Sequence, residues 1–222
     1  MALAKHFIIV TIDGGAAAGK SSTARALSKR HHLLYVDTGS FYRSITLYLL
    51  KRGLHPDETD KIREALENPA VTTELRSREA RMAIDGEVPG AELRNREVNE
   101  QVSHFASRQV VRDFLLDYQR GHAGFARENG FDGIVMEGRD IGSVIFPDAD
   151  FRFFLDADPS ARSQRRSDQG EEDSVEERDR LDTGRKSAPL ICPEGAVRID
   201  TTRMTLEEVI EKVSGIISNE GP

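Results

Sequence analysis

Short apolar runs alternate along the chain with longer segments whose apolar residues recur at helical spacing. The short runs are rich in β-branched and aromatic residues, as in strands buried on both faces. They cover residues 5–12, 33–36, 133–136, 151–155 and 197–199. Helical spacing follows the second run at Phe41, Ile45 and Leu49, and Gly53 provides a stop signal. This alternation predicts an α/β protein with a doubly wound core and a five-stranded parallel sheet.

Two further stretches depart from this alternation. Between residues 56 and 94, charged helical sequence precedes two short alternating segments around a polar turn, which predicts a small antiparallel insert. From Asn95 to Glu128 the pattern predicts a long amphipathic helix. Near the end of the chain, Thr205 with Glu208 three residues later predicts the N-cap of a last helix.

The segment from Gln164 to Lys186 is almost wholly polar and is interrupted by two glycines, so it has no apolar face to bury. We expect it to form a short lid, at about 166–186, on a single domain that spans residues 1–222. The predicted division of the remaining chain is a core at about 1–55, 95–165 and 187–222, and an insert at about 56–94.

Composition narrows the class of protein. With 38% hydrophobic and 31% charged residues, and no apolar run near the roughly 18 residues that cross a bilayer, the chain is predicted to be soluble. The lone Cys192 and the short N-terminal apolar stretch predict a reducing, cytoplasmic setting. A net charge of -7 argues against nucleic acid as a partner, yet 24 of the 31 bases are arginine. Arginine matches phosphate oxygens two at a time, so these residues could bind a small anion; codon bias is the alternative explanation.

A phosphate-binding pattern lies directly after the first predicted strand. Gly14, four residues, Gly19, Lys20 and Ser21 fit GxxxxGK[ST] between a strand and a helix. We expect backbone N–H groups and the helix N-terminus to hold the phosphates of a nucleotide, Lys20 to reach its β and γ phosphates, and the Ser21 hydroxyl to ligate Mg²⁺ alongside water and phosphate oxygens. The predicted ATP-binding loop comprises Gly14, Gly15, Ala16, Ala17, Ala18, Gly19, Lys20, Ser21 and Ser22.

This loop alone leaves a GTPase, an ATPase, a kinase and a sensor open, and three further segments bear on the choice. Residues 37–43 place a carboxylate at a strand end and an arginine one turn into the next helix. Residues 137–149 repeat an Arg and Asp pair after a later strand, and residues 177–190 bring more arginines out of the polar stretch. Ligands bind at this edge of an open α/β sheet, so an anionic second substrate is expected there.

These segments resemble the bacterial cytidylate kinases, a family of nucleoside monophosphate kinases. The resemblance covers essentially the whole chain, in order: the phosphate loop, DTGxxYR, the insert, EVNxxVSxxA, GRDIGxVxFPDA, RDxxDxxRxxAPL and IDTTxxTLEEVI. It implies a P-loop NTPase-type core with an insert that binds the nucleoside monophosphate. It also implies transfer of the γ-phosphoryl group of ATP to CMP or dCMP by a monomer, without a covalent intermediate.

The resemblance assigns the phosphate-binding residues. Arg43, Arg139 and Arg185 match positions that hold the phosphate of the acceptor nucleotide, with Thr38 nearby. Together with Lys20, Arg139 and Arg185 are the expected catalytic residues. Guanidinium groups suit a phosphate dianion because charge-assisted hydrogen bonds are strong. Three arginines at the start of the polar stretch match positions that flank the donor nucleotide, and Arg166 is the one we assign to it: Arg162, Arg165 and Arg166.

The resemblance also assigns the nucleoside. Ser103, Arg112 and Asp140 match positions that read cytosine, and Arg178 with Asp182 matches a pair that contacts the ribose. Cytosine offers an amino donor at N4 beside acceptors at N3 and O2, so a carboxylate with an arginine suits that edge. Uracil presents an acceptor where Asp140 requires a donor.

The chain departs from the family pattern in places, and two other functions remain open. The lid is shorter than in the longer members, Leu181 stands where an arginine is common, and Thr38 replaces a common serine. One alternative is a small-molecule kinase with a hydroxyl acceptor, similar to shikimate kinase, with Asp37 as the base. The other is a nucleotide sensor without turnover, which would not need the acceptor arginines.

Overall fold

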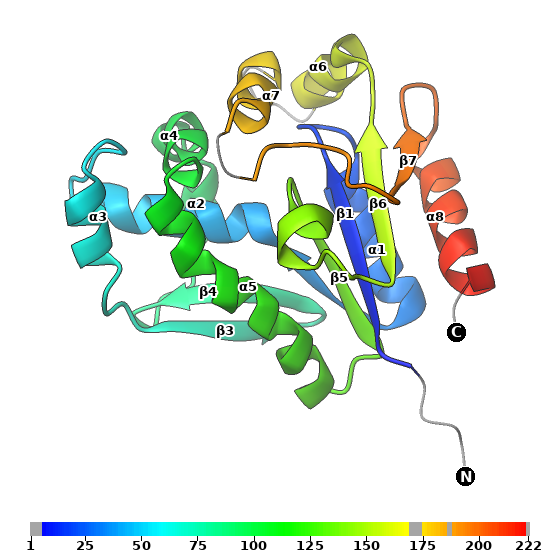
Figure 1. Cartoon of the computed structure of the whole chain (residues 1–222), viewed down its shortest axis with the longest axis horizontal. Coiled ribbons are helices and arrows are strands. Elements are labelled where there is room, and N and C mark those ends of the chain that lie inside the picture. Colours follow the sequence, from blue (N-terminus) through cyan, green and yellow to red (C-terminus); the bar gives the residue numbers. More distant parts are fainter. Residues whose placement is uncertain (1–5, 169–174, 186–187, 221–222) are drawn as a thin grey trace.

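The computed structural model describes residues 6–168, 175–185 and 188–220. In this part of the chain the strands form one central sheet with helices on both faces (Figure 1). In chain order they are β1 (Ile8–Gly14), β2 (Leu33–Asp37), β3 (Val71–Arg76), β4 (Glu79–Ile84), β5 (Gly133–Gly138), β6 (Phe151–Asp156) and β7 (Val197–Asp200). Their order across the sheet is β3-β4-β2-β5-β1-β6-β7. The predicted doubly wound α/β core is confirmed.

Five of these strands, β2, β5, β1, β6 and β7, run parallel, as the sequence predicts. The predicted antiparallel pair in the insert is also present as β3 and β4. This hairpin is continuous with the core sheet, because β4 pairs in parallel with β2 through Tyr35 with Glu79 and Val36 with Ala80. The two strands of the insert therefore belong to the same sheet as the core strands.

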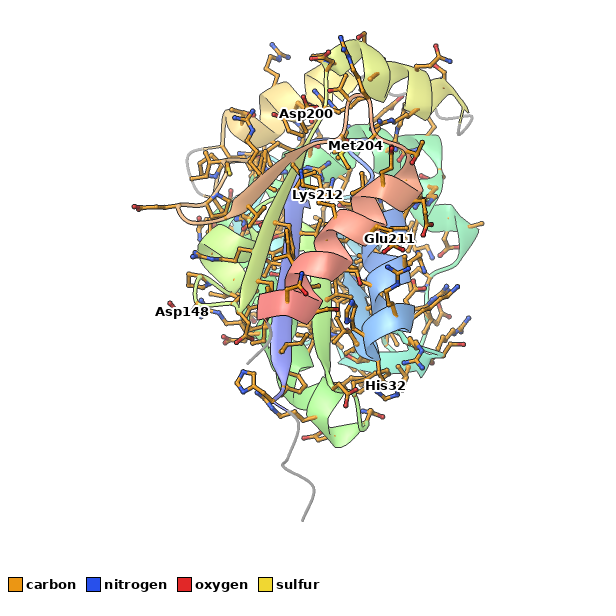
Figure 2. The ribbon with its side chains drawn as sticks, turned by 90° about the vertical axis from the view of Figure 1, so that its right-hand side faces the viewer. His32, Asp148, Asp200, Met204, Glu211 and Lys212 are labelled. Atoms are coloured by element: carbon orange, nitrogen blue, oxygen red, sulfur yellow. The ribbon has the colours of Figure 1, made fainter. Side chains whose placement is uncertain are left out.

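Helices pack on each face of the sheet because the core strands are apolar on both sides. In β2, Leu33 and Tyr35 contact the cluster that contains α1 and α8, whereas Leu34 and Val36 contact the cluster that contains α2, α4 and α5. Figure 2 shows α8 beside α1 on the first face. The helices are α1 (Lys20–His31), α2 (Thr38–Leu50), α3 (Thr59–Ala65), α4 (Arg96–Ala106), α5 (Gln109–Glu128), α6 (Pro159–Asp168), α7 (Val175–Thr183) and α8 (Leu206–Glu220).

The single long helix expected from Asn95 to Glu128 is wrong, since the structure divides it into α4 and α5. Ser107 donates its hydroxyl to the carbonyl of His104 over 2.7 Å, and the extended backbone of Arg108 starts the next helix. Amphipathic spacing continues across the break, so the pattern did not reveal it.

The observed ends of two other helices agree with the sequence better than the break between α4 and α5 does. The Thr205 and Glu208 capping pair is confirmed: Thr205 N donates to the Glu208 carboxylate over 2.7 Å, and Glu208 N donates to Thr205 Oγ1 over 3.3 Å. Helix α2 begins at Thr38, where the Asp37 carboxylate caps it by accepting from Ser40 N over 3.1 Å. Within the described residues, no helix is both long and apolar enough to cross a membrane.

Candidate active site

The phosphate loop connects β1 to α1 at the carboxyl edge of the sheet. Gly14 has a φ of +149°, and a Cβ there would lie 2.1 Å from the carbonyl oxygen of Leu155 on β6. Gly19 has a φ of +93° immediately before the first residue of α1. Because L side chains rarely adopt these φ values, both glycines of the pattern are required by the backbone itself.

Lys20 is buried inside this loop, where its Nζ donates to the carbonyl of Gly15 over 2.7 Å. Burial and the nearby Arg139 guanidinium lower the pKa of Lys20, while the Glu137 carboxylate opposes that shift. Among the described residues Lys20 donates to a carbonyl rather than to a carboxylate, and a cation so held at a helix N-terminus is well placed to bind phosphate.

Glu137 lies beside Ser21, and the sequence analysis assigned it no role. It occupies β5 next to β1, with Ser21 Oγ donating to one carboxylate oxygen over 2.9 Å and the Tyr35 hydroxyl donating to the other over 2.5 Å. Burial raises its pKa, with the carboxylate of Asp37 adding to the shift. An acid at the end of a buried strand was the available signal, and the parallel pairing with β1 brings it to the loop.

The oxygens of Ser21 and Glu137 suit a hard cation such as Mg²⁺. Mg²⁺ is usually held by one or two carboxylates together with substrate phosphates and water, not by a complete protein cage. The residues present therefore fit the predicted ion.

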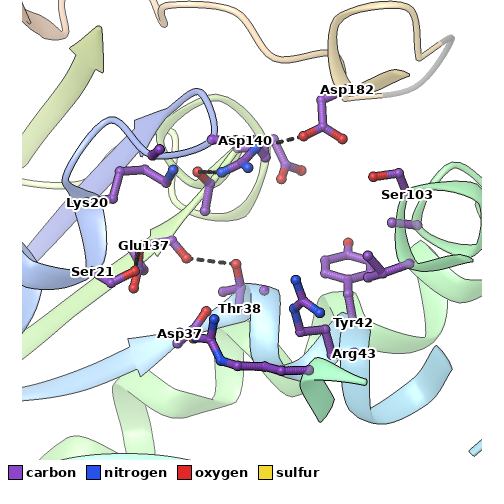
Figure 3. A pocket seen from close by; sticks show the side chains of 18 of the residues that line it. Lys20, Ser21, Asp37, Thr38, Tyr42, Arg43, Ser103, Glu137, Asp140 and Asp182 are labelled. Atoms are coloured by element: carbon purple, nitrogen blue, oxygen red, sulfur yellow. Dashed lines mark hydrogen bonds and ion pairs between the residues drawn. The ribbon is translucent and has the colours of Figure 1, made fainter. Parts of the chain in front are cut away.

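A cavity beside the loop collects most of the predicted acceptor residues, as Figure 3 shows. It is lined from α2, α4, the segment after β5, and the end of α7. Tyr42 and Glu137 also line it, although the sequence analysis assigned neither. The predicted residues that it brings together are Thr38, Arg43, Ser103, Arg139, Asp140, Asp182 and Arg185, together with Lys20, Ser21 and Arg166.

Asp140 forms a buried ion pair with Arg112, whose guanidinium donates to its carboxylate. The side chains are only 5% and 6% exposed, respectively. Asp140 lines the cavity but Arg112 does not, so the arginine holds the carboxylate from behind. Burial raises the pKa of Asp140, and the charge of Arg112 opposes that rise. The arrangement presents one fixed carboxylate to the cavity.

Two of the predicted phosphate-binding arginines converge on Asp182. Arg139 Nε donates to Asp182 Oδ2 over 2.7 Å, and Arg185 donates to Oδ1 of the same carboxylate. The third, Arg43, donates to Asn99 Oδ1 over 2.6 Å and to the Leu93 carbonyl over 2.9 Å. Guanidinium groups aimed at one carboxylate indicate an anion site, because phosphate oxygens accept the same bonds. The predicted contact between Asp182 and a ribose remains a prediction.

A second cavity opens on the other side of the loop. The two cavities share Lys20 and Ser21, along with Ala17, Arg94 and Arg166. The second is also lined by Ala18, Gly19 and Ser22 of the loop and by Arg165. Apolar or weakly polar side chains from the C-terminal part complete it: Thr201, Met204, Leu206 and Val209. A donor and an acceptor bound in these cavities would therefore meet at the phosphate loop.

The arginines near the predicted lid differ in the groups that they contact. Arg162 is bonded to the carboxylate of Asp179, which also accepts from the Ala16 backbone N–H over 3.1 Å. Arg165 donates to the carbonyl of Thr201 over 2.6 Å. The predicted ribose contact of Arg178 lies outside the described residues, since its side chain is not part of them.

A phosphate loop at the junction of two cavities, both of them lined by arginines, defines a P-loop phosphotransferase with two anionic substrates. The family model of cytidylate kinase matches residues 10–219, and the chain belongs to that family. It is 36% identical to a cytidylate kinase of Streptomyces griseus, over 98% of this chain and 95% of the relative. It is 40% identical to one of Chlorobaculum tepidum, over 96% and 94%, and 38% identical to one of Caldanaerobacter subterraneus, over 92% of each.

Proposed function

We propose that this protein transfers the γ-phosphoryl group of ATP to CMP or dCMP, giving ADP with CDP or dCDP. The observation that carries the proposal is the pair of cavities that meet at Lys20, one of which contains a buried carboxylate held by Arg112. Family membership supports the same activity.

The acceptor base is selected by hydrogen-bond complementarity. The Asp140 carboxylate accepts from the N4 amino group of cytosine, and the buried bond to Arg112 favours its charged form and fixes its position. The hydroxyl of Ser103, on α4, lines the same cavity. Uracil places a carbonyl oxygen opposite Asp140, so two acceptors would face each other and binding would be weaker.

Transfer depends on position and charge rather than on a general base. The second pKa of a phosphate monoester is near 6, so at neutral pH the acceptor is mostly a dianion. One of its oxygens attacks the γ-phosphorus while the bond to the β–γ bridging oxygen breaks, and ADP leaves. Lys20, Arg139 and Arg185 offset the repulsion between the two substrates and stabilise the charge of the transferring group. Asp37, the base of the alternative kinase, lines the acceptor cavity and caps α2 with one carboxylate oxygen.

The metal has a defined role in this scheme. Ser21 and Glu137 would hold Mg²⁺, which when bound neutralises charge on the β and γ phosphate oxygens. Tyr35 holds one carboxylate oxygen of Glu137, and the other oxygen is the one that contacts Ser21.

Replacing Glu137 with glutamine should raise the Mg²⁺ concentration for half-maximal activity by about tenfold, because the amide keeps the size of the side chain but removes its charge. Glu79→Gln is the matched control, since Glu79 pairs with Arg25 and does not line either substrate cavity. The measurement is a Mg²⁺ titration of initial rates at saturating nucleotides. An unchanged Mg²⁺ dependence in Glu137→Gln would remove Glu137 from the metal site.

The function itself is tested with a panel of acceptors. ATP and Mg²⁺ are supplied with CMP, dCMP, UMP, AMP or shikimate, and formation of ADP is followed. We expect the highest kcat/KM with CMP or dCMP. Activity with shikimate alone would indicate the hydroxyl-acceptor kinase, and ATP binding without turnover of any acceptor would indicate the sensor.

We also propose that the protein acts as a monomer in the cytoplasm. Cys192 is a free, exposed thiol, which suits a reducing compartment. Both cavities are lined by one chain, so a second copy is not needed to complete the site. A sedimentation mass equal to two chains would contradict the monomer.

A further inference from the structure

Asp13 is a buried carboxylate at the carboxyl end of β1. It belongs to β1, directly before Gly14 and the phosphate loop, and is 1% exposed. Its Oδ1 accepts from the backbone N–H of Ile141 over 2.8 Å, and its Oδ2 accepts from that of Gly142 over 2.7 Å. These two N–H groups follow Asp140 directly, so one side chain joins the start of the donor loop to the segment that reads the acceptor.

The bonded segment is also tightly packed at both ends. A Cβ on Gly142 would lie 2.8 Å from Thr11 Oγ1 and 3.3 Å from Asp13 Oδ2. A Cβ on Gly138 would lie 2.6 Å from the side chains of Thr38 and Ile141. Both glycines allow the backbone to approach closely, and Arg139 with Asp140 lies between them. The position of these two residues is therefore set by backbone contacts as well as by their own ion pairs.

An apolar side chain at this position would favour the free energy of folding more than a buried carboxylate does. Removing a charge from water is unfavourable, and burial raises the pKa of Asp13 to about 6 despite the two N–H donors. The charged groups that act on it are Asp140, which adds to the rise, and Lys20, which opposes it. Thr11, on the same face of β1, is also fully buried and lies near Gly142, whereas Val10 and Ile12 belong to the opposite, apolar face. We therefore attribute the carboxylate at this position to its two hydrogen bonds with the backbone of Ile141 and Gly142.

We propose that Asp13 is a positioning residue that fixes Arg139 and Asp140 relative to the phosphate loop. It does not touch either nucleotide. It acts by holding the backbone just after Asp140, so that the base-reading carboxylate and the phosphate-binding guanidinium keep their distance from Lys20. This inference rests on the roles proposed above for Arg139 and Asp140.

The test is Asp13→Asn. The amide supplies one acceptor oxygen but turns an NH₂ group toward the second N–H, so one of the two bonds is replaced by a contact between donors. We expect KM for CMP to rise about tenfold and the CMP to UMP ratio of kcat/KM to fall by a similar factor, because small misplacements of positioned groups are costly. KM for ATP should change by less than about twofold, since the loop glycines and α1 are untouched.

Asp150→Asn is the matched control. Asp150 Oδ2 accepts from the backbone N–H of Ile9 over 2.7 Å, which is the same kind of bond at the opposite end of β1. Its loss should leave the CMP to UMP ratio unchanged. If folded Asp13→Asn keeps the wild-type ratio, or if both variants raise the KM values of CMP and ATP by equal factors, the positioning role is wrong.

A second variant covers the case in which Asp13→Asn does not fold. Gly142→Ala keeps the carboxylate but pushes the bonded backbone away from it, and it should lower the same ratio. An unchanged ratio in Gly142→Ala would overturn the proposal. Failure of the proposed function can be told apart from failure of the positioning role of Asp13. If the proposed function is wrong, the wild-type protein itself shows no preference for CMP.

Discussion

Replacing Lys20 with alanine should lower kcat by about a thousandfold, which is the upper range for loss of one preorganised group that stabilises transition-state charge. The ammonium lies inside the phosphate loop and lines both cavities, so it can contact the group that moves between them. It is buried, and among the described residues its hydrogen-bond acceptor is the Gly15 carbonyl rather than a carboxylate. The measurement is the rate of ADP formation with CMP and ATP both saturating.

The control for this prediction is Lys29→Ala, which removes an exposed lysine from the same helix. It should keep wild-type kcat. Thermal unfolding separates chemistry from folding: because burial disfavours the charged form of Lys20, its removal should not lower the melting temperature. A Lys20→Ala variant that keeps kcat within about tenfold of wild type would show that charge stabilisation comes mainly from the arginines.

The core and the phosphate loop could be predicted from the sequence because both depend on local pattern. Strands such as β2 are apolar on both faces, which marks a parallel sheet, and the spacing of Gly14, Gly19 and Lys20 specifies the loop. The pairing of β4 with β2 could not be predicted in this way. It depends on which strand edges meet after folding. The alternating pattern of apolar and polar residues is the same in a separate hairpin as in a hairpin at the edge of a larger sheet.

The sequence predicted which residues form the site better than it predicted which of them contact one another. The resemblance identified Asp140 and Arg112, but only the structure shows that Arg112 is behind the carboxylate and outside the cavity. Glu137 and Asp13 were passed over because a single acid near a strand end has no characteristic spacing. Their partners are more than a hundred positions away in sequence: Ser21 for Glu137, and the Ile141 and Gly142 amides for Asp13.

The ion pair behind the acceptor site determines how base selection should be tested. Asp140→Ala should abolish most of the preference for CMP over UMP, a change of roughly 10- to 100-fold in the ratio of kcat/KM values. It also leaves the Arg112 guanidinium buried without its carboxylate, at a cost of about 3–5 kcal/mol in the free energy of unfolding. A loss of activity in this variant alone would therefore mix recognition with instability.

Two further variants separate these effects. Arg112→Met combined with Asp140→Ala removes both charges, so stability should recover relative to Asp140→Ala while the CMP preference stays lost. Arg43→Ala removes a group at the phosphate end of the cavity and should raise the KM values of CMP and UMP by the same factor. If the proposed roles hold, specificity and affinity depend on different ends of one cavity, and the ratio of CMP to UMP activity reports only the Asp140 end. If the double variant kept its preference for CMP, a residue other than Asp140 would read the base.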